Sequence, residues 1–423
     1  MTVQDMQLTH IGLENDDFAE GVPHETFRLL RREAPIYWYE WKLGRAFWCI
    51  TRHSDLVTTH RDTETFSSEI GATALEDLDP EQIEARKSML DTDPPRHTRL
   101  RALVTKDFTP RALSAYEMLL RELSREIIDR ASHHSELDFV QEIAAVLPIR
   151  VLAQILGVPD ADTPQLIEWS DRMIGNTDPD FADVLLDSPE SEEYRLLPFR
   201  SPAALEVFEY GHRMGEDRRK HPKDDIVSKL VQAEIDGDRL TEREFDTIFL
   251  LLVVAGNETT RQAIAHGMRA LIEHPDQMES MRERRQDVTF MKTATEEIVR
   301  WATPVMHFRR TATRDVEMRG ILIRAGDKVV TWYISANHDE EVFVEPFRFD
   351  LSRRPNDHVS FGKGGPHHCL GAHLARLEIR IMFEELLPRM ADVGMLSEPE
   401  RMRSNFTNAI KRMPVRVRWA ELP

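Results

Sequence analysis

FGKGGPHHCLG, residues 361–371, is a glycine- and proline-rich loop that brings Cys369 to the start of a helix predicted at 370–388. Gly364 and Gly365 allow a positive φ or a close approach of the backbone to another group. The free N–H groups and the dipole at a helix start favour a thiolate over a thiol. Because an axial metal ligand requires an electron-rich sulfur held in a rigid loop, we interpret Cys369 as a candidate metal ligand.

Two other interpretations of this loop stay open. A buried structural cysteine beside a turn is the more frequent meaning of a Cys-Gly loop. A zinc site would draw on four neighbouring residues, His367, His368, Cys369 and His373. Structural zinc sites usually show two separated ligand pairs. This chain has only one other cysteine, Cys49, so the zinc interpretation has little support.

A second motif, AGNETT (255–260), lies in a long helix predicted at 241–274 and overlaps the end of the apolar run 248–255. A carboxylate is costly to bury without partners, so Glu258 asks for a functional reason. A hydroxyl that competes for backbone carbonyls can open a helix locally. A cavity beside such an opening could hold a small molecule and receive protons from Glu258 and Thr259. The alternative is a solvated turn in which the threonines pack through their methyl groups.

Charged and polar residues elsewhere are placed to bind carboxylates. His97 and Arg101 lie four residues apart, directly after the helix-start sequence Asp93-Pro94-Pro95, so both project from one face. With Arg310 and His367 they make four donors suited to carboxylate groups. Taken singly, such residues are usually ordinary solvated side chains.

Glu297 and Arg300 lie three residues apart on a helix predicted at 288–302, where they can form an ion pair. Many such pairs are solvated and contribute little to stability.

Composition limits the classes of protein that this chain can belong to. Its 423 residues include 41% hydrophobic and 30% charged residues, enough for a large buried core. The net charge of −19 is poorly suited to nucleic acid or an anionic membrane surface. Two cysteines exclude a disulfide framework and fit a reducing cytoplasm. The start of the chain does not resemble a signal peptide, and the longest apolar run is far below the roughly 20 residues of a membrane helix. We therefore expect a cytoplasmic protein with no membrane anchor and no nucleic-acid partner.

The order of predicted elements is mostly helical, with small sheets. Apart from the segments already named, the pattern predicts a hairpin at 36–50, helices at 93–132, 139–156 and 201–221, a loop at 176–200, and β-type segments at 308–323 and 327–335. This order differs from alternating βα units. We predict a mainly α fold with small antiparallel β-sheets, forming a single domain over 1–423.

Together, these motifs resemble the cytochrome P-450 superfamily of haem-thiolate monooxygenases. The resemblance covers nearly the whole chain, and its motifs occur in the family's order: DPPRHTRLR (93–101), AGNETT (255–260), EEIVR (296–300), FRRTATRD (308–315), SANHDE (335–340), FRFDLSR (347–353) and GGPHHCLG (364–371). The family's common loop places Phe seven residues before the cysteine, whereas Phe361 lies eight before Cys369. Some members that act on sterols and branched lipids share this longer loop and the Asn-Glu pair, and the resemblance is nearest to members that hydroxylate steroids, terpenoids or branched lipids.

The resemblance implies roles for individual residues. Cys369 would be the proximal ligand of haem b (iron protoporphyrin IX), and Thr259 and Glu258 would deliver protons to bound dioxygen. The haem propionates would be bound by His97, Arg101, Arg310 and His367. Further haem contacts would come from Gly365, Phe361, Ala255 and Gly256. The substrate pocket would include Leu251, Ala255, Met306 and Phe308. A structural network would join Glu297, Arg300 and Arg353.

The reaction implied is monooxygenation of a hydrophobic small molecule (a sterol, a terpenoid, or a branched or fatty chain) by dioxygen, two electrons and two protons. The electrons would come from a ferredoxin and its ferredoxin reductase, because no flavin- or nicotinamide-binding segment is evident. A basic patch for the ferredoxin would comprise Arg101, Lys106, Arg111, Lys363 and Arg376. Three alternatives remain: a non-catalytic haem-thiolate sensor or carrier, a peroxide-driven peroxygenase, and a zinc or thiol hydrolase.

Overall fold

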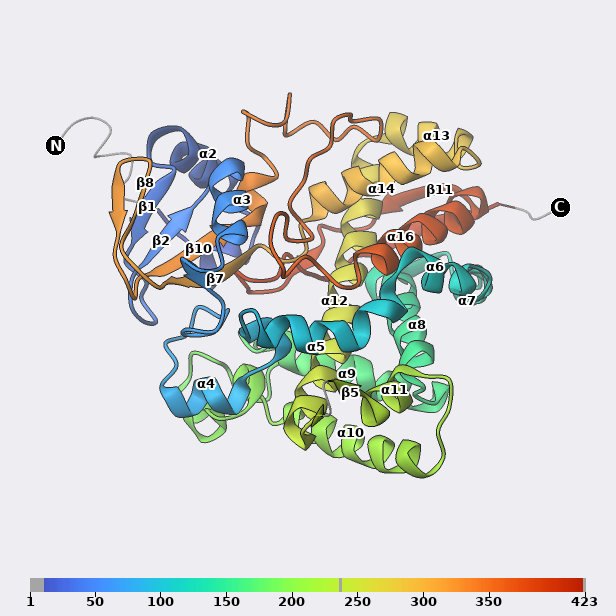
Figure 1. The fold of residues 1–423 in the computed structure, drawn as a ribbon. Coiled ribbons are helices and arrows are strands. Elements are labelled where there is room, and N and C mark those ends of the chain that lie inside the picture. The colour runs from blue at the N-terminus through green and yellow to red at the C-terminus, as the bar shows by residue number, and fades with distance from the viewer. Residues whose placement is uncertain (1–10, 236–237, 421–423) are drawn as a thin grey trace.

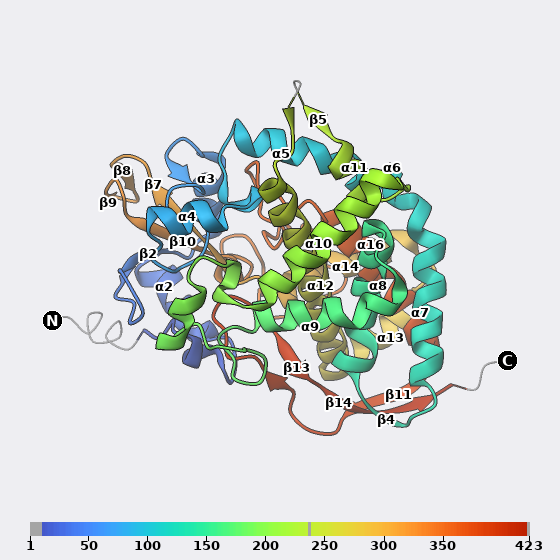
Figure 2. The same cartoon turned by 90° about the horizontal axis from the view of Figure 1, so that it is seen from below.

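A 32-residue helix, α12 (Glu242–Glu273), runs through the middle of the molecule, and most other helices pack around it (Figures 1 and 2). The computed structural model describes residues 11–235 and 238–420. Thr241 begins α12 with a capping box, since its hydroxyl accepts from the Glu244 N–H and the Glu244 carboxylate accepts from the Thr241 N–H. Nearly every residue of α12 from Phe245 to Leu271 is buried, which accounts for its long apolar run.

The remaining helices are mostly amphipathic, and many of them share one large hydrophobic core with α12, whereas α2, α3 and α15 pack in two smaller core clusters beside the largest sheet. They are α2 (His24–Glu33), α3 (His53–Arg61), α4 (Pro80–Arg86), α5 (Arg96–Thr105), α6 (Pro110–Leu113), α7 (Glu117–Ala131), α8 (Val146–Leu156), α9 (Thr163–Ile174), α10 (Ala203–Lys220), α11 (Ile226–Gln232), α13 (Pro275–Glu283), α14 (Val288–Ala302), α15 (Tyr333–Ala336) and α16 (Ala372–Leu386). Helices α8, α9, α10, α14 and α16 all contact α12 directly. Among the described residues, no helix is long and apolar enough to cross a membrane.

The largest sheet lies to one side of the helices and has the strand order β1-β2-β10-β7-β3 (Figure 1). Its strands are β1 (Ile36–Tyr39), β2 (Phe47–Ile50), β3 (Phe66–Ser67), β7 (His307–Ala312) and β10 (Lys328–Trp332). Four smaller sheets, one with three strands and three with two, use β4 (Glu136–Asp138), β5 (Glu234–Ile235), β6 (Asp238–Arg239), β8 (Val316–Met318), β9 (Ile321–Ile323), β11 (Met390–Met395), β12 (Glu400–Arg401), β13 (Ile410–Arg412) and β14 (Pro414–Trp419).

The prediction of a mainly α fold with small sheets is confirmed, but the sheets are not all antiparallel. Strand β10 pairs with β2 in parallel, with Val330 opposite Cys49. The predicted hairpin is confirmed, because β1 and β2 pair antiparallel with Ile36 opposite Ile50. The pattern at 327–335 continues past the strand into α15, so its last three residues are helical.

The helix predicted at 93–132 is in fact several helices, α5, α6 and α7, joined by short 3-10 turns. The sequence Thr109-Pro110 accounts for the break between α5 and α6, because proline disfavours a helical conformation of the residue before it. The Thr109 hydroxyl then accepts from the Ala112 N–H at 3.3 Å and so caps the start of α6. The segment 139–156 likewise divides into a π-helical turn at 140–144 and α8, which ends at the left-handed Gly157 as predicted.

Candidate active site

Cys369 lies just before α16. The residue is exposed to solvent, although protein atoms surround its sulfur closely enough to act on its pKa. The backbone N–H groups of Gly371 and Ala372 lie near its sulfur, and its own N–H donates to the Phe361 carbonyl at 2.7 Å. Burial raises the pKa of the Cys369 thiol, whereas those N–H groups and the nearby Arg101 oppose the rise. The loop therefore presents a sulfur whose negative charge has donors ready to stabilise it.

The glycines of the loop meet two separate geometric needs. Gly364 has a φ of +98°, a left-handed conformation that favours glycine. Gly365 lies so close to the backbone carbonyl of His60 on α3 that any side chain would collide with it. The loop is therefore wedged against α3, which fixes the position of the cysteine.

One face of α12 is accessible although the helix is otherwise buried. Leu251 and Thr259 are partly exposed and Ala255 is exposed, while Val253, Val254, Asn257 and Glu258 are buried. The accessible residues are four apart and so form one stripe along the helix. The Thr259 hydroxyl lies on this stripe and donates to the Ala255 carbonyl at 3.0 Å.

Glu258 is turned away from this stripe and is 1% exposed. One carboxylate oxygen contacts the Arg261 guanidinium and the other accepts from Gln262 Nε2 at 2.7 Å. Burial, the largest influence, raises the pKa of the Glu258 carboxyl, and Arg261 opposes the rise. The sequence predicts Glu258 and Thr259 as neighbours in function, and the structure places their side chains on different sides of α12.

The four predicted carboxylate donors come together beside the cysteine loop. The rings of His97 and His367 are 4.1 Å apart, and Arg101 donates to the His368 carbonyl at 2.5 Å. Burial and the neighbouring Arg310 lower the pKa of His367 to about 2, and burial with Arg101 lowers the pKa of His97 to about 4. Two ring nitrogens, His97 Nδ1 and His367 Nε2, are buried without a hydrogen-bond partner. Within residues 11–235 and 238–420, neither Arg101 nor Arg310 forms an ion pair with a carboxylate.

The three residues of the predicted structural network, Glu297, Arg300 and Arg353, contact one another through the Glu297 carboxylate. Glu297 and Arg300 are both 0% exposed and make a bidentate pair with two N···O distances of 2.8 Å. Arg300 also donates to the carbonyls of Asn337 and Pro346, each at 2.9 Å. Arg353 reaches Glu297 at 3.1 Å. This network ties α14 to the long segment that leads to Cys369.

Comparison with known proteins decides the family. The family model described as Cytochrome P450 matches residues 13–391. The chain belongs to the cytochrome P450 family. It is 41% identical over 409 residues to a steroid C26-monooxygenase of Mycobacterium tuberculosis, covering 94% of this chain and 90% of that one. It is 40% identical over 410 residues to a methyl-branched lipid omega-hydroxylase of the same organism, covering 95% and 91%.

A solved structure agrees with these relatives. A Mycobacterium marinum cytochrome P450 in complex with pseudoionone superposes with a TM-score of 0.86 at 39% identity, covering 96% of this chain and 98% of that one. This P450 is thus an oxidoreductase of the monooxygenase class, and its family carries haem iron bound by a cysteine thiolate.

The residues of this P450 fit haem. A porphyrin with two propionates needs an accessible thiolate, a small-residue surface, and cationic and neutral hydrogen-bond donors. Cys369 and Ala255 provide the first two, and the cluster of Arg101, Arg310, His97 and His367 provides the donors. The partnerless ring nitrogens of His97 and His367 would be satisfied by propionate oxygens. In contrast, the zinc interpretation is wrong for the described part of the chain, where no three His, Cys, Asp or Glu side chains are grouped to hold a metal.

Some predicted pocket and cofactor residues of the P450 take other positions. Met306 is 0% exposed and packs in a separate core cluster with Phe18, Phe27 and Trp332, so it does not line the accessible region. An apolar side chain such as Met306 can pack either in a core cluster or in a substrate pocket, and the sequence does not distinguish the two. The side of Gly256 that would carry a side chain faces Leu152 on α8. Phe308, on β7, remains partly exposed, as expected for a pocket residue.

Phe361 keeps a place beside the cysteine loop despite the extra residue. Its ring lies under the Arg376 guanidinium, 4.3 Å from the centroid, and its carbonyl accepts from Cys369. The ring therefore covers the side of the loop where Arg376 lies.

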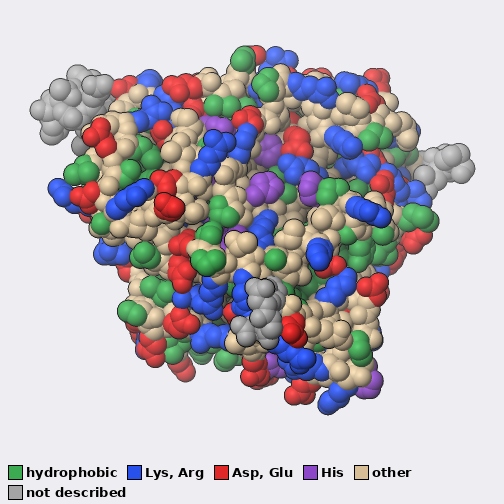
Figure 3. Space-filling model, in the orientation of Figure 1, with side chains coloured by type: hydrophobic (Ala, Val, Ile, Leu, Met, Phe, Trp, Pro, Cys, Tyr) green, Lys and Arg blue, Asp and Glu red, His purple; other side chains and the backbone are tan. Residues whose placement is uncertain are grey.

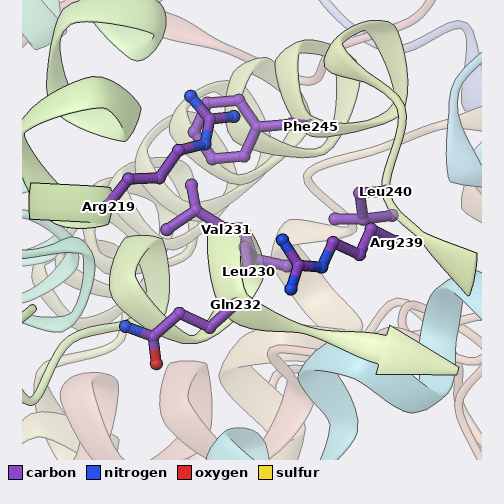
Figure 4. Close-up of a pocket in the computed structure, with 7 residues that line it drawn as sticks. All are labelled: Arg219, Leu230, Val231, Gln232, Arg239, Leu240 and Phe245. Atoms are coloured by element: carbon purple, nitrogen blue, oxygen red, sulfur yellow. The ribbon is translucent and has the colours of Figure 1, made fainter. Parts of the chain in front are cut away.

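Two surface pockets of the P450 lie outside this site. One, of about 330 Å³, is lined by Arg219, Leu230, Val231, Gln232, Arg239, Leu240 and Phe245 from α10, α11, β6 and α12 (Figure 4). The other, of about 790 Å³, lies over β11 and β14. Neither shares a residue with the predicted active site, so we base the site on the residues described above.

Sequence reasoning missed three charged residues around α12, of which Arg261 and Glu378 are buried and Asp171 is partly exposed. Arg261 and Asp171 form an ion pair at 2.8 Å, and Glu378 of α16 accepts a hydrogen bond from the Thr260 hydroxyl. Burial raises the pKa of Glu378 well above its usual value. Arg261 directly follows AGNETT in the sequence, but its burial could not be predicted without knowing that α9 packs beside it.

Proposed function

We propose that this P450 binds haem b through Cys369 and hydroxylates a branched, largely apolar substrate near the end of its chain. When bound, the haem supplies reductive activation of dioxygen and insertion of one oxygen atom into a C–H bond. The observation that carries the proposal is the accessible stripe on α12, at Leu251, Ala255 and Thr259, together with the exposed Cys369.

The chemistry of this stripe supports a hydrophobic substrate. Leu251 and Ala255 offer only apolar surface, and Phe308 of β7 adds a partly exposed ring. Ligand pockets are typically apolar with a few polar groups that orient the ligand. Here Thr259 is the polar group, and its hydroxyl is held by the Ala255 carbonyl.

The relatives favour the terminal position. One is named a steroid C26-monooxygenase and the other a methyl-branched lipid omega-hydroxylase. Both names describe oxidation at the far end of a branched hydrocarbon chain, so we propose the same position here.

A titration of the haem absorption band tests this proposal directly. We expect a band shift with a steroid that has a branched side chain and with a methyl-branched fatty acid, because both place a branched end beside the α12 stripe. An unbranched fatty acid of equal length is the matched ligand and should bind at least about tenfold more weakly, the effect of a lost methyl contact or two. Equal binding of the branched and unbranched acids would contradict the substrate class.

Replacing Thr259 by alanine should separate electron use from product formation. The variant loses the hydroxyl that, together with the Glu258 carboxyl, we propose delivers protons, while the apolar stripe stays intact. We expect product formation to fall by about 100-fold, at the lower end of general acid–base effects, with continued oxygen uptake appearing as hydrogen peroxide. Thr259→Ser keeps the hydroxyl and should retain most product formation. Full product yield from Thr259→Ala would contradict the role.

We propose a ferredoxin and ferredoxin reductase as the electron source and the cytoplasm as the location. On the face seen in Figure 3, Lys, Arg and His side chains gather around the centre. Of the predicted patch, Lys106 and Arg111 are exposed. Lys363 pairs with Asp357 and Arg376 with Glu296, which weakens their contribution. Arg61 is exposed beside Gly364 and adds a cation that the sequence did not indicate.

A further inference from the structure

A cluster of three charged side chains, Glu258, Arg261 and Asp171, lies behind the accessible stripe of α12. Glu258 and Arg261 are buried, and the Asp171 side chain is 13% exposed. Glu258 and Arg261 are one turn apart on α12, and Asp171 is on α9. The Arg261 side chain is 2% exposed. Its guanidinium contacts Glu258 and approaches Asp171 Oδ1 to 2.8 Å. The function proposed above uses Glu258 but gives no role to Asp171.

The charges of this cluster do not balance. Two carboxylates share one guanidinium, so the cluster carries one excess negative charge when both carboxylates are ionised. The other group bonded to Glu258 is the neutral amide of Gln262, which is itself held by the Ile410 N–H at 2.8 Å. Glu258 is the more deeply buried of the two carboxylates, with its side chain 2% exposed against 13% for Asp171. Burying an uncompensated charge is costly, and a proton on Glu258 removes that charge where the cost is greatest.

Charged side chains on the neighbouring elements have partners of their own. The pairs are Arg150 of α8 with Glu126, Lys411 of β13 with Asp180, Arg172 of α9 with Asp183, and Glu297 of α14 with Arg300. Glu378 of α16 is bonded to Thr260, and Glu142 of the π-helical turn accepts from the Asp138 N–H. Arg261 and Asp171 are therefore the charged groups that act on Glu258 within the described residues.

These two groups act on Glu258 in opposite directions. Burial raises the pKa of the Glu258 carboxyl most, and the negative charge of Asp171 raises it further. Arg261 lowers the pKa of Glu258, but its guanidinium also forms an ion pair with Asp171. The proton is therefore held more firmly than it would be in a simple Glu–Arg pair.

We propose that Asp171 is a positioning residue that keeps one proton on Glu258 in the resting enzyme by sharing Arg261 with it. This inference rests on the proposed function, in which Glu258 and Thr259 deliver protons. Because Asp171 belongs to α9, the protonation of Glu258 would also depend on how closely α9 packs against α12.

Infrared spectroscopy of the haem-loaded protein tests the proposal without turnover. The C=O stretch of protonated Glu258 is identified as the signal that disappears in Glu258→Gln, which separates it from the buried carboxyl of Glu378. In the unmodified protein we expect this signal at neutral pH. In Asp171→Asn the guanidinium serves Glu258 alone, so the signal should be lost at a pH lower by about one unit.

Three further results decide the matter. Asp171→Glu keeps the charge and should restore the midpoint, and Glu168→Gln, which removes an exposed acid from the same helix, should leave it unchanged. Above a certain pH, the enzyme should consume electrons without forming an equal amount of product. This pH should be lower in Asp171→Asn by the same amount as the shift of the infrared signal. A residue that only held α9 against α12 would not change it. An unshifted signal in folded Asp171→Asn overturns the proposal.

Failure of a variant to fold, failure of this inference and failure of the proposed function give different results. If Asp171→Asn does not fold, absence of the Glu258 signal from the unmodified protein at neutral pH overturns the proposal just as well. If the protein binds haem with a thiolate-type spectrum but the infrared result is negative, only this inference fails. If the thiolate-type spectrum is absent, the proposed function fails.

Discussion

Replacing Arg300 by alanine is expected to prevent accumulation of folded, haem-loaded protein. Arg300 and Glu297 are fully buried, and the guanidinium also satisfies the carbonyls of Asn337 and Pro346. Its removal leaves the Glu297 carboxylate with one guanidinium, that of Arg353, and the neutral donors of Asn356 and Asp350, and it leaves two carbonyls without a donor. Breaking a buried pair of this kind costs about 3–5 kcal/mol, a large share of the stability of a protein.

The measurement is the midpoint of thermal unfolding together with the haem content of the purified variant. Arg348→Ala is the matched control, because Arg348 forms an i,i+3 pair with Glu345 whose side chains are 61% and 66% exposed. That pair should contribute less than about 1 kcal/mol. Recovery of Arg300→Ala with unchanged haem content and midpoint would count against the structural role of the network.

Replacing Cys369 by alanine is expected to abolish monooxygenase turnover. The variant removes the sulfur on which the N–H groups of Gly371 and Ala372 converge, and no other described residue of the loop offers a thiolate. The fold should survive, since the loop is held by its glycines and by the Phe361 carbonyl. We expect no measurable product with reduced ferredoxin, under conditions in which the unmodified enzyme turns over.

Cys49→Ala provides the control for this variant. Cys49 lies in β2, is fully buried, and burial raises the pKa of its thiol, so it is suited to packing and not to ligation. We expect this variant to keep both product formation and haem content. Turnover by Cys369→Ala, or its loss in Cys49→Ala with the fold intact, would show that the wrong cysteine had been assigned.

Local patterns account for the parts of the site that the sequence predicted. The step of four residues between Leu251, Ala255 and Thr259 is a helical repeat, so their common face follows from the sequence. The EEIVR motif likewise places Glu297 and Arg300 one turn apart, and a bidentate pair is the result. The prediction of one domain over 1–423 stays a prediction.

The rest depends on contacts between distant segments. Nothing near Glu258 in the sequence indicates that Asp171 of α9 competes for Arg261. The parallel pairing of β2 with β10 joins segments from opposite ends of the chain. Met306 is an apolar residue between a helix and a strand, and which side it packs on is decided by the aromatic cluster around Trp332. Side-chain direction at such positions is a tertiary property that local periodicity does not contain.

The ligation of haem iron by Cys369 is tested most directly by the absorption spectrum of the purified, unmodified protein after reduction and exposure to carbon monoxide. We expect the long-wavelength Soret band that thiolate ligation produces. A protein that stays colourless after reconstitution with hemin, or one that shows only the band of a neutral ligand, would contradict the assignment of Cys369 as the iron ligand.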